Sequence, residues 1–208
     1  MKSKKIYIIR HGQTDYNLRG IVQGCGVDSV LNETGHQQAE AFYQFYKSFP
    51  FDKVYTSNLQ RTVQSVQKFI DDGIPHQKLE GLNEIHWGNK EGQPFTPEEN
   101  DYYLKVTREW QEGKIDVCIE GGESPVKVME RQKIAISHIL NQENELNVLV
   151  CMHGRAMRIL LCHILNYHLK CMDMFEHHNL GLYEVTYTGS MFVVDKYNDL
   201  RHLNILKT

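Results

Sequence analysis

The sequence predicts an α/β protein, a three-layer sandwich in which helices cover both faces of a mostly parallel, doubly wound sheet. Short apolar runs typical of buried strands alternate along the chain with segments whose apolar residues recur every three or four positions, as in helices. With 208 residues, of which 41% are hydrophobic, the chain can bury one sizeable core. Strands that alternate with helices over this length form a sheet of this kind.

The first half of the chain contains two strand–helix pairs. Residues 6–9 are β-branched and aromatic without polar alternation, as expected of a strand buried on both faces. A helix is expected over 34–49, a second strand over 52–57, and a second helix over 58–73 that stops at Gly73.

The second half continues this alternation. Ser124 and Pro125 have the residue types of an N-cap and a first helical position, so a helix is expected from there to about Gln142. The other elements expected are a strand at 147–152, a helix at 155–167, and two strands at 180–187 and 191–198 that form a hairpin.

Residues 93–121 are expected to form a lid-like helical excursion within a single domain that spans 1–208. One helix is predicted at about 97–112, with Tyr103, Val106 and Trp110 spaced to pack against the rest of the protein. A simple packed helix and a functional lid are both compatible with this pattern.

Charge and cysteine content limit the classes of function. The formal net charge of −3 provides no broad basic field for nucleic acid or membrane lipids, so any anion must be bound by a local cluster. The five cysteines are odd in number and contain no C-x-x-C pair, which argues against a disulfide framework or a zinc knuckle. The apolar run before Arg10 is too short for the core of a signal peptide. We therefore expect a cytoplasmic protein.

Charged residues follow three of the expected strands. Arg10 and His11 end the first strand, Arg61 lies shortly after the second, and His153 follows the strand at 147–152. Ligands of open α/β sheets bind outside the carboxyl ends of the strands. Each residue alone has an ordinary reading, such as a solvated helix residue for Arg61. Together they predict an anion site at one edge of the sheet.

Several stretches resemble the histidine phosphatase superfamily, the phosphoglycerate mutase-like enzymes. They are RHGQTDYN (10–17), QGCGVDSVLNETGHQQA (23–39), TSNLQRTVQSV (56–66), LNEIHWGNKEG (82–92), GGES (121–124) and VCMHGRAMR (150–158). These stretches follow the order of the family and cover most of the chain. The resemblance implies a phosphoglycerate mutase-like fold, and WGNKEG is closer to the phosphatase branch that includes α-ribazole and broad-specificity phosphatases.

The resemblance implies roles for five catalytic residues. His11 attacks phosphorus and becomes phosphohistidine, and His153 stabilises the phosphoryl oxygens, for which we expect it to be cationic in the complex. Glu84 is the expected general acid and base; taken alone it would read as a solvated loop residue. Arg10 and Arg61 can each present a planar fork of donors to two phosphoryl oxygens.

Five further residues are expected to bind the substrate. Gly12 and Gly154 follow the two histidines and would let the backbone approach a ligand closely. Asn17 is expected to donate its side-chain amide to the phosphoryl group, although a plain turn former is nearly as good a reading. Gln23 and Gly24 belong to a matched family stretch.

No metal or other cofactor is expected. Among the eleven histidines there is no pair spaced for one helix face with a carboxylate cluster, and no phosphate-binding P-loop motif is present. His177 and His178 are therefore read as surface or core histidines. Cys25 stands where members of the resembled family commonly carry an aromatic residue.

The sequence therefore predicts a metal-independent phosphomonoester hydrolase that acts on a small phosphorylated metabolite through phosphohistidine. Two alternatives stay open: phosphoryl transfer of the cofactor-dependent phosphoglycerate mutase type, and a phosphate-binding module without catalysis. The expected partner is a small phosphate monoester, with neither nucleic acid nor membrane; a homodimer is left open.

Overall fold

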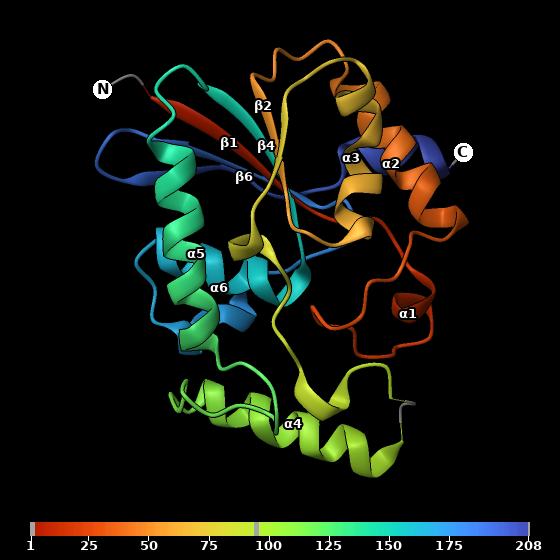
Figure 1. The fold of residues 1–208 in the computed structure, drawn as a ribbon, viewed down its shortest axis with the longest axis vertical. Helices are drawn as coiled ribbons and strands as arrows, with labels where there is room; N and C mark the ends of the chain where they lie inside the picture. The colour runs from red at the N-terminus through yellow and green to blue at the C-terminus, as the bar shows by residue number, and fades with distance from the viewer. Residues whose placement is uncertain (1–2, 94–95, 208) are drawn as a thin grey trace.

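A computed structural model describes residues 3–93 and 96–207 (Figure 1). Residues 94 and 95 of the expected excursion lie outside this range. The strands are β1 (Lys4–Arg10), β2 (Lys53–Thr56), β3 (His76–Lys78), β4 (Asn147–Met152), β5 (Leu182–Tyr187) and β6 (Phe192–Asp199). The α-helices are α1 (Asp15–Leu18), α2 (Glu33–Tyr46), α3 (Gln60–Asp71), α4 (Pro97–Gln111), α5 (Pro125–Leu140) and α6 (Gly154–Ile164). Short 3₁₀ helices are η1 (Glu80–Leu82), η2 (Gly88–Lys90), η3 (Leu169–Met174) and η4 (Arg201–Lys207).

The strands form one sheet in the order β3-β2-β4-β1-β5-β6. The first four strands of this order run parallel to one another, and β5 is antiparallel to both of its neighbours, β1 and β6. Strand β4 lies between β1 and β2, pairing Val150 with Ile8 on one side and with Tyr55 on the other. The carboxyl ends of these three central strands therefore lie at one edge.

Both faces of the sheet are covered, which confirms the predicted sandwich (Figure 1). Ile6 and Ile8 point to a core that contains residues of α5 and α6, while Tyr7 and Ile9 point to a second core that contains residues of α2 and α3. This alternation explains why β1 is apolar without interruption, because both sides of the strand are buried.

The predicted long elements are present, with ends that differ by at most three residues. Ser124 is the N-cap of α5, where its side chain accepts a hydrogen bond from the backbone N–H of Lys127, and Pro125 opens the helix. One strand and one α-helix, both short, were missed, as were the 3₁₀ helices. Strand β3 consists of His-Gln-Lys and has no apolar run, and α1 is a single turn held by a capping box between Thr14 and Asn17.

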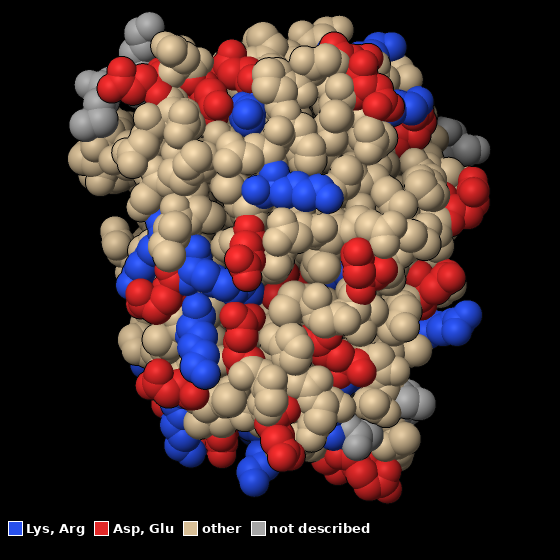
Figure 2. All heavy atoms as spheres, viewed as in Figure 1, with Lys and Arg blue, Asp and Glu red and all other residues tan. Residues whose placement is uncertain are grey.

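Helix α4 forms the excursion and lies beyond α6 at one end of the molecule (Figure 1). Val106 and Trp110 are buried as predicted, and the Trp110 ring lies 5.6 Å from that of Trp87. On the face shown in Figure 2, Lys and Arg side chains are interspersed with Asp and Glu side chains. In the two described ranges, no helix has the length and apolar character needed to cross a membrane.

Candidate active site

The edge where β1, β2 and β4 end carries the predicted residues. His11 continues from β1, and its backbone N–H still donates to the carbonyl of Met152 at the end of β4, at 3.0 Å. His153 follows Met152 directly, and the rings of the two histidines lie 5.1 Å apart. The crevice expected from parallel-sheet topology is therefore where these residues meet.

The hydrogen bonds of His11 fix its tautomer. Its Nδ1 lies 2.7 Å from the carbonyl oxygen of Gly12, and a carbonyl can only accept, so Nδ1 carries the proton. The lone pair of the ring is then on Nε2. Burial and the nearby charges of Arg61 and Arg10 lower the pKa of His11 well below its usual value, so the ring is neutral at physiological pH. His11 has the form that a nucleophile requires.

Arg10 lies next to His11 and lines the cavity. One of its terminal nitrogens donates to Nδ1 of His177 at 3.2 Å, while its buried Nε has no partner within the described part of the chain. Burial lowers the pKa of Arg10 to about 10, which leaves it charged at neutral pH. The unpartnered Nε is a donor available to an anion.

Arg61, in the first turn of α3, is completely buried. Its guanidinium donates to the carbonyls of Val27 and Gly24 at 2.7 and 3.1 Å. Its Nε donates to Nδ1 of His153 at 3.2 Å. Three fixed acceptors thus hold one guanidinium behind the two histidines.

His153 is neutral in the free protein. Because its Nδ1 accepts from Arg61, its proton is on Nε2, which lies 2.8 Å from the hydroxyl oxygen of Ser57. Burial, followed by the charge of Arg61, lowers the pKa of His153 well below its usual value. The cationic form expected in a complex is therefore not the form of the free protein.

Glu84 lies at the N-terminus of α6 and lines the cavity. Its Oε1 accepts the backbone N–H groups of Ile85 and Ala156 at 2.9 and 2.8 Å, and its Oε2 accepts that of Arg155 at 3.1 Å. The free N–H groups and dipole of a helix N-terminus favour a carboxylate there. Glu84 is 6% exposed, and its carboxylate is held beside the crevice rather than solvated in a loop.

A cavity of about 570 Å³ opens at this edge. Its lining includes the predicted residues Arg10, His11, Asn17, Gln23, Glu84 and Gly154. The amide oxygen of Asn17 accepts from the backbone N–H of Thr14 and from the side chain of Asn179. These bonds leave the amide N–H groups of Asn17 for other acceptors. Gln23 is held by Thr14 and Ser29.

Four predicted residues are not among the described residues that line this cavity: Gly12, Gly24, Arg61 and His153. Gly12 is required by packing, because a Cβ there would lie 2.7 Å from the carbonyl oxygen of Gly35. Gly24 supplies the carbonyl that holds Arg61. Gly12 was expected to let the backbone approach a ligand closely. In the structure it instead lets the backbone pack closely against α2.

Sequence reasoning missed several residues of the cavity. His177 and Asn179 come from the loop before β5, Tyr103 from α4, and Arg155 and Arg158 from α6. The reading of His177 as a surface or core histidine is wrong, because it lines the cavity and accepts from Arg10. Burial, and next the charge of Arg10, lowers the pKa of His177 to about 2.

Arg155 and Arg158 form a second cationic group in the cavity. Both donate to Oδ1 of Asp173, at 2.6 and 2.7 Å, so two guanidiniums share one carboxylate. The Arg155 guanidinium also lies 5.5 Å from the ring centroid of Trp110 and 6.0 Å from that of Trp87. Both arginines lie on α6, Arg155 in the N-terminal turn that holds Glu84 and Arg158 three residues further along the helix.

Comparisons with known proteins agree with this geometry. Residues 6–200 match the model of the histidine phosphatase superfamily, branch 1. The chain is 33% identical over 165 residues to 6-phosphofructo-2-kinase/fructose-2,6-bisphosphatase 1 of Mus musculus, covering 78% of this chain and 33% of that protein. The chain thus spans about a third of the length of that relative.

Two solved structures share the fold. Phosphoserine phosphatase of Entamoeba histolytica, in complex with 3-phosphoglyceric acid, has a TM-score of 0.82 at 26% identity over 96% of this chain and 99% of that chain. The α-ribazole phosphatase of Shigella flexneri has a TM-score of 0.83 at 19% identity over 94% and 96%. The match over nearly the whole chain, together with two histidines and two arginines at the edge of the sheet, shows that this protein belongs to the histidine phosphatase superfamily.

Proposed function

We propose that this protein is a metal-independent phosphomonoesterase that works through phosphohistidine at His11. The observation that carries the proposal is the state of His11: it is neutral, its Nδ1 proton is held by the Gly12 carbonyl, and its lone pair is therefore on Nε2. Neutral imidazole next to guanidiniums suits attack on a phosphate dianion. The family match and the phosphatase names of the relatives support this reading.

The proposed reaction has two steps. In the first, Nε2 of His11 attacks phosphorus, the P–O bond to the substrate alcohol breaks, and protonated Glu84 gives its proton to the leaving oxygen. In the second, the Glu84 carboxylate takes a proton from water, which attacks phosphorus and breaks the P–N bond. Arg10, Arg61 and His153 stabilise the charge on the phosphoryl oxygens, and inorganic phosphate leaves.

We propose a small substrate that carries a second anionic group. The cavity volume is in the range of small-molecule sites. Arg155 and Arg158 also line it, from α6 rather than from the end of β1, and they share one carboxylate. Two comparisons support this proposal. The mouse relative is named for a bisphosphate, and the Entamoeba structure contains 3-phosphoglyceric acid; both molecules carry two anionic groups. A cytoplasmic location is proposed with it.

Rapid quenching tests the mechanism. With substrate radiolabelled in the phosphoryl group, we expect acid-labile, base-stable label on the protein, and no label on the His11→Ala variant at unchanged circular dichroism. Label on serine would refute the mechanism. Hydrolysis of p-nitrophenyl phosphate should be unchanged in EDTA. Phosphate binding without hydrolysis would instead indicate a binding module, and label passed to an acceptor alcohol would indicate a mutase.

A further inference from the structure

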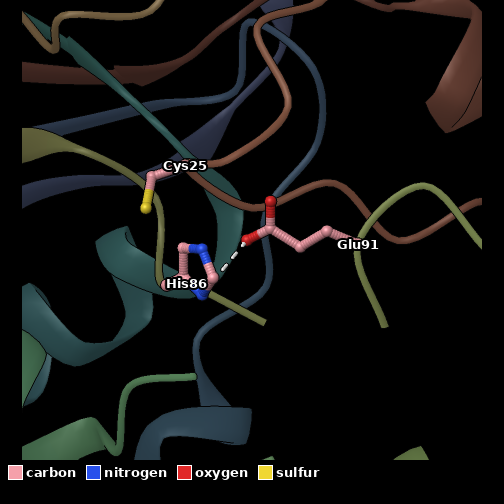
Figure 3. A group of neighbouring side chains, drawn as sticks. All are labelled: Cys25, His86 and Glu91. Atoms are coloured by element: carbon pink, nitrogen blue, oxygen red, sulfur yellow. Dashed lines mark ion pairs between the residues drawn. The ribbon is translucent and has the colours of Figure 1, made fainter. Parts of the chain in front are cut away.

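Three side chains with metal-ligating atoms meet beside the cavity (Figure 3). Cys25 comes from the loop that follows Gly24, and His86 and Glu91 come from the segment after Glu84. One ligand atom from each residue lies within 4.8 Å of the other two. None of the three is among the described residues that line the active-site cavity, so the cluster has no place in the reaction proposed above.

Glu91 has an unsatisfied oxygen in this cluster. Its side chain is only 7% exposed. Oε1 accepts the backbone N–H of Trp87 at 2.8 Å and lies 3.9 Å from Nδ1 of His86, whereas Oε2 is buried without a partner in the described ranges. A buried carboxylate oxygen without a donor is costly unless a cation or another donor satisfies it.

The loop around Cys25 is shaped to this carboxylate. A Cβ on Gly24 would lie 2.0 Å from Oε1 of Glu91, and a Cβ on Gly26 would lie 2.5 Å from Oε2. The two glycines therefore let the backbone wrap the carboxylate with Cys25 between them. The Gly26 Cβ would also lie 3.2 Å from Nε2 of His86, which places the imidazole at the same spot.

We propose that Cys25, His86 and Glu91 bind a zinc ion. Sulfur, imidazole nitrogen and carboxylate oxygen form a donor set that suits Zn²⁺ and is too soft for Mg²⁺ or Ca²⁺. Tetrahedral zinc places neighbouring ligand atoms about 3.3–3.6 Å apart. The Nδ1–Oε1 distance of 3.9 Å is close to this, and because the three ligand atoms lie within 4.8 Å of one another, no separation must shorten by more than about 1 Å.

Zinc binding would change the proton on Cys25 and a hydrogen bond of His86. The thiol proton of Cys25 goes to solvent as sulfur binds zinc. Nδ1 of His86 accepts the backbone N–H of Gly88 at 3.0 Å, so that nitrogen is unprotonated, and it must give up this hydrogen bond when its lone pair binds the metal. Oε2 of Glu91 gains the partner that it lacks, and water completes the tetrahedron.

The ion would join two segments that position catalytic groups. The carbonyls of Gly24 and Val27, on either side of Cys25, hold the guanidinium of Arg61. The segment with His86 and Glu91 begins next to Glu84. Zinc would thus fasten the loop that holds Arg61 to the segment that carries Glu84, without contacting substrate. The inference is independent of the proposed phosphatase activity.

Metal binding to the purified, chelator-treated chain tests the site. We expect one equivalent of Zn²⁺ per chain in competition with a chromophoric chelator, and a rise in melting temperature, because an ion that binds only the folded state stabilises it. Co²⁺ in place of zinc should give a thiolate charge-transfer band. Cys25→Ala and His86→Asn should each weaken zinc binding more than about tenfold, since even outer-shell partners contribute that much.

Cys118→Ala is the matched control, because Cys118 is also a partly buried free cysteine, and it should bind zinc like the unchanged chain. Equal zinc affinity in Cys25→Ala and the unchanged chain, or a cobalt complex without a thiolate band, would overturn the proposal and leave Glu91 as a plain anchor of the loop. If Cys25→Ala does not fold, His86→Asn and the cobalt spectrum decide. The proposed zinc adds stability and is not needed for turnover, so hydrolysis of p-nitrophenyl phosphate by the chelator-treated chain, at a temperature where it stays folded, separately reports on the phosphatase.

Discussion

The inner and outer parts of the cavity are built differently. The inner part consists of Arg10 and His11, which line the cavity at the end of β1, and of the neighbouring Arg61 and His153, which are buried and lie outside the described lining. The outer part consists of Tyr103, Arg155 and Arg158, which come from α4 and from α6. Both contain two arginines, but among the described residues only those of the outer part are paired with a carboxylate, that of Asp173.

This difference separates chemistry from selection. The inner guanidiniums are held by carbonyls and imidazoles, so their charge is available to a phosphoryl group. The outer guanidiniums are paired with Asp173, so the net charge of this group is smaller than that of two arginines alone. Arg155 also lies near the ring of Trp110, so its position depends on α4, a helix outside the sheet. The inner part should act on every monoester alike, and the outer part should distinguish among them.

The largest effect is expected from the nucleophile. His11→Asn should lower kcat by at least about 10⁴-fold, a size typical of a lost catalytic group. The loss should be the same for p-nitrophenyl phosphate and for a substrate with two anionic groups, because both use the same inner part. Steady-state kinetics with the two substrates measures it. A loss with only one of the two substrates would show that the inner part does not act on all monoesters alike.

Glu84→Gln should have the next largest effect. General acid catalysis contributes about 10²–10⁴-fold, so kcat for an alkyl phosphate should fall by that factor. The fall should be smaller for p-nitrophenyl phosphate, whose leaving group needs little protonation. A series of phenyl phosphates with different leaving-group pKa values gives the measurement. Equal losses across the series would mean that Glu84 is not the acid.

The two parts also differ in how far the sequence predicts them. Arg10, His11 and His153 follow apolar runs that are recognisable as buried strands, and parallel topology brings such ends together. His177 was missed because its loop precedes β5, which is antiparallel to β1; the start of β5 therefore lies next to the end of β1, where the N–H of Leu180 donates to the Arg10 carbonyl at 2.9 Å. The apolar run of a strand does not reveal whether that strand is parallel or antiparallel to its neighbours.

The outer part was missed for a second reason. Arg155 and Arg158 are three residues apart in the helix that follows His153, which places both on one helix face. The sequence alone could therefore have indicated that they lie together. Their position in the cavity depends on α4 and η3, which pack against each other and supply Tyr103 and Asp173 as partners of Arg155, and the sequence does not show that packing. Strand β3 was similarly invisible, since its pairing with β2, not its composition, makes it a strand.

Arg158→Gln should separate the substrates. A charge-assisted hydrogen bond is worth about 1.5–3 kcal/mol, so kcat/KM for a substrate with a second anionic group should fall about 10- to 100-fold. For p-nitrophenyl phosphate it should stay within about twofold. Arg108→Gln, an exposed arginine on α4 that is absent from the described cavity lining, is the matched control and should leave both values unchanged. Equal losses for both substrates would place Arg158 in the inner part.

The smallest expected effect is on stability in mild acid. His11 and His153 have pKa values lowered by burial and then by Arg61, and burial lowers that of His202 to about 4. The unfolded chain therefore binds protons below about pH 6.5 that the folded chain does not, so stability is full above that pH and is lost as the pH falls. The pKa of Asp173 is lowered by the two outer arginines despite its burial, so their pairing persists in this window.

Between about pH 7.5 and 5.5, each histidine that stays neutral in the folded state should cost about 1 kcal/mol of unfolding free energy. Urea unfolding at the two pH values measures the total, and His11→Gln should show a loss smaller by about that amount, because glutamine takes up no proton in either state. Between about pH 7.5 and 8.5 the variant and the unchanged chain should run in parallel. An equal acid loss in both would mean that His11 is protonated in the folded protein, and its Nε2 lone pair would then be unavailable for attack below neutral pH.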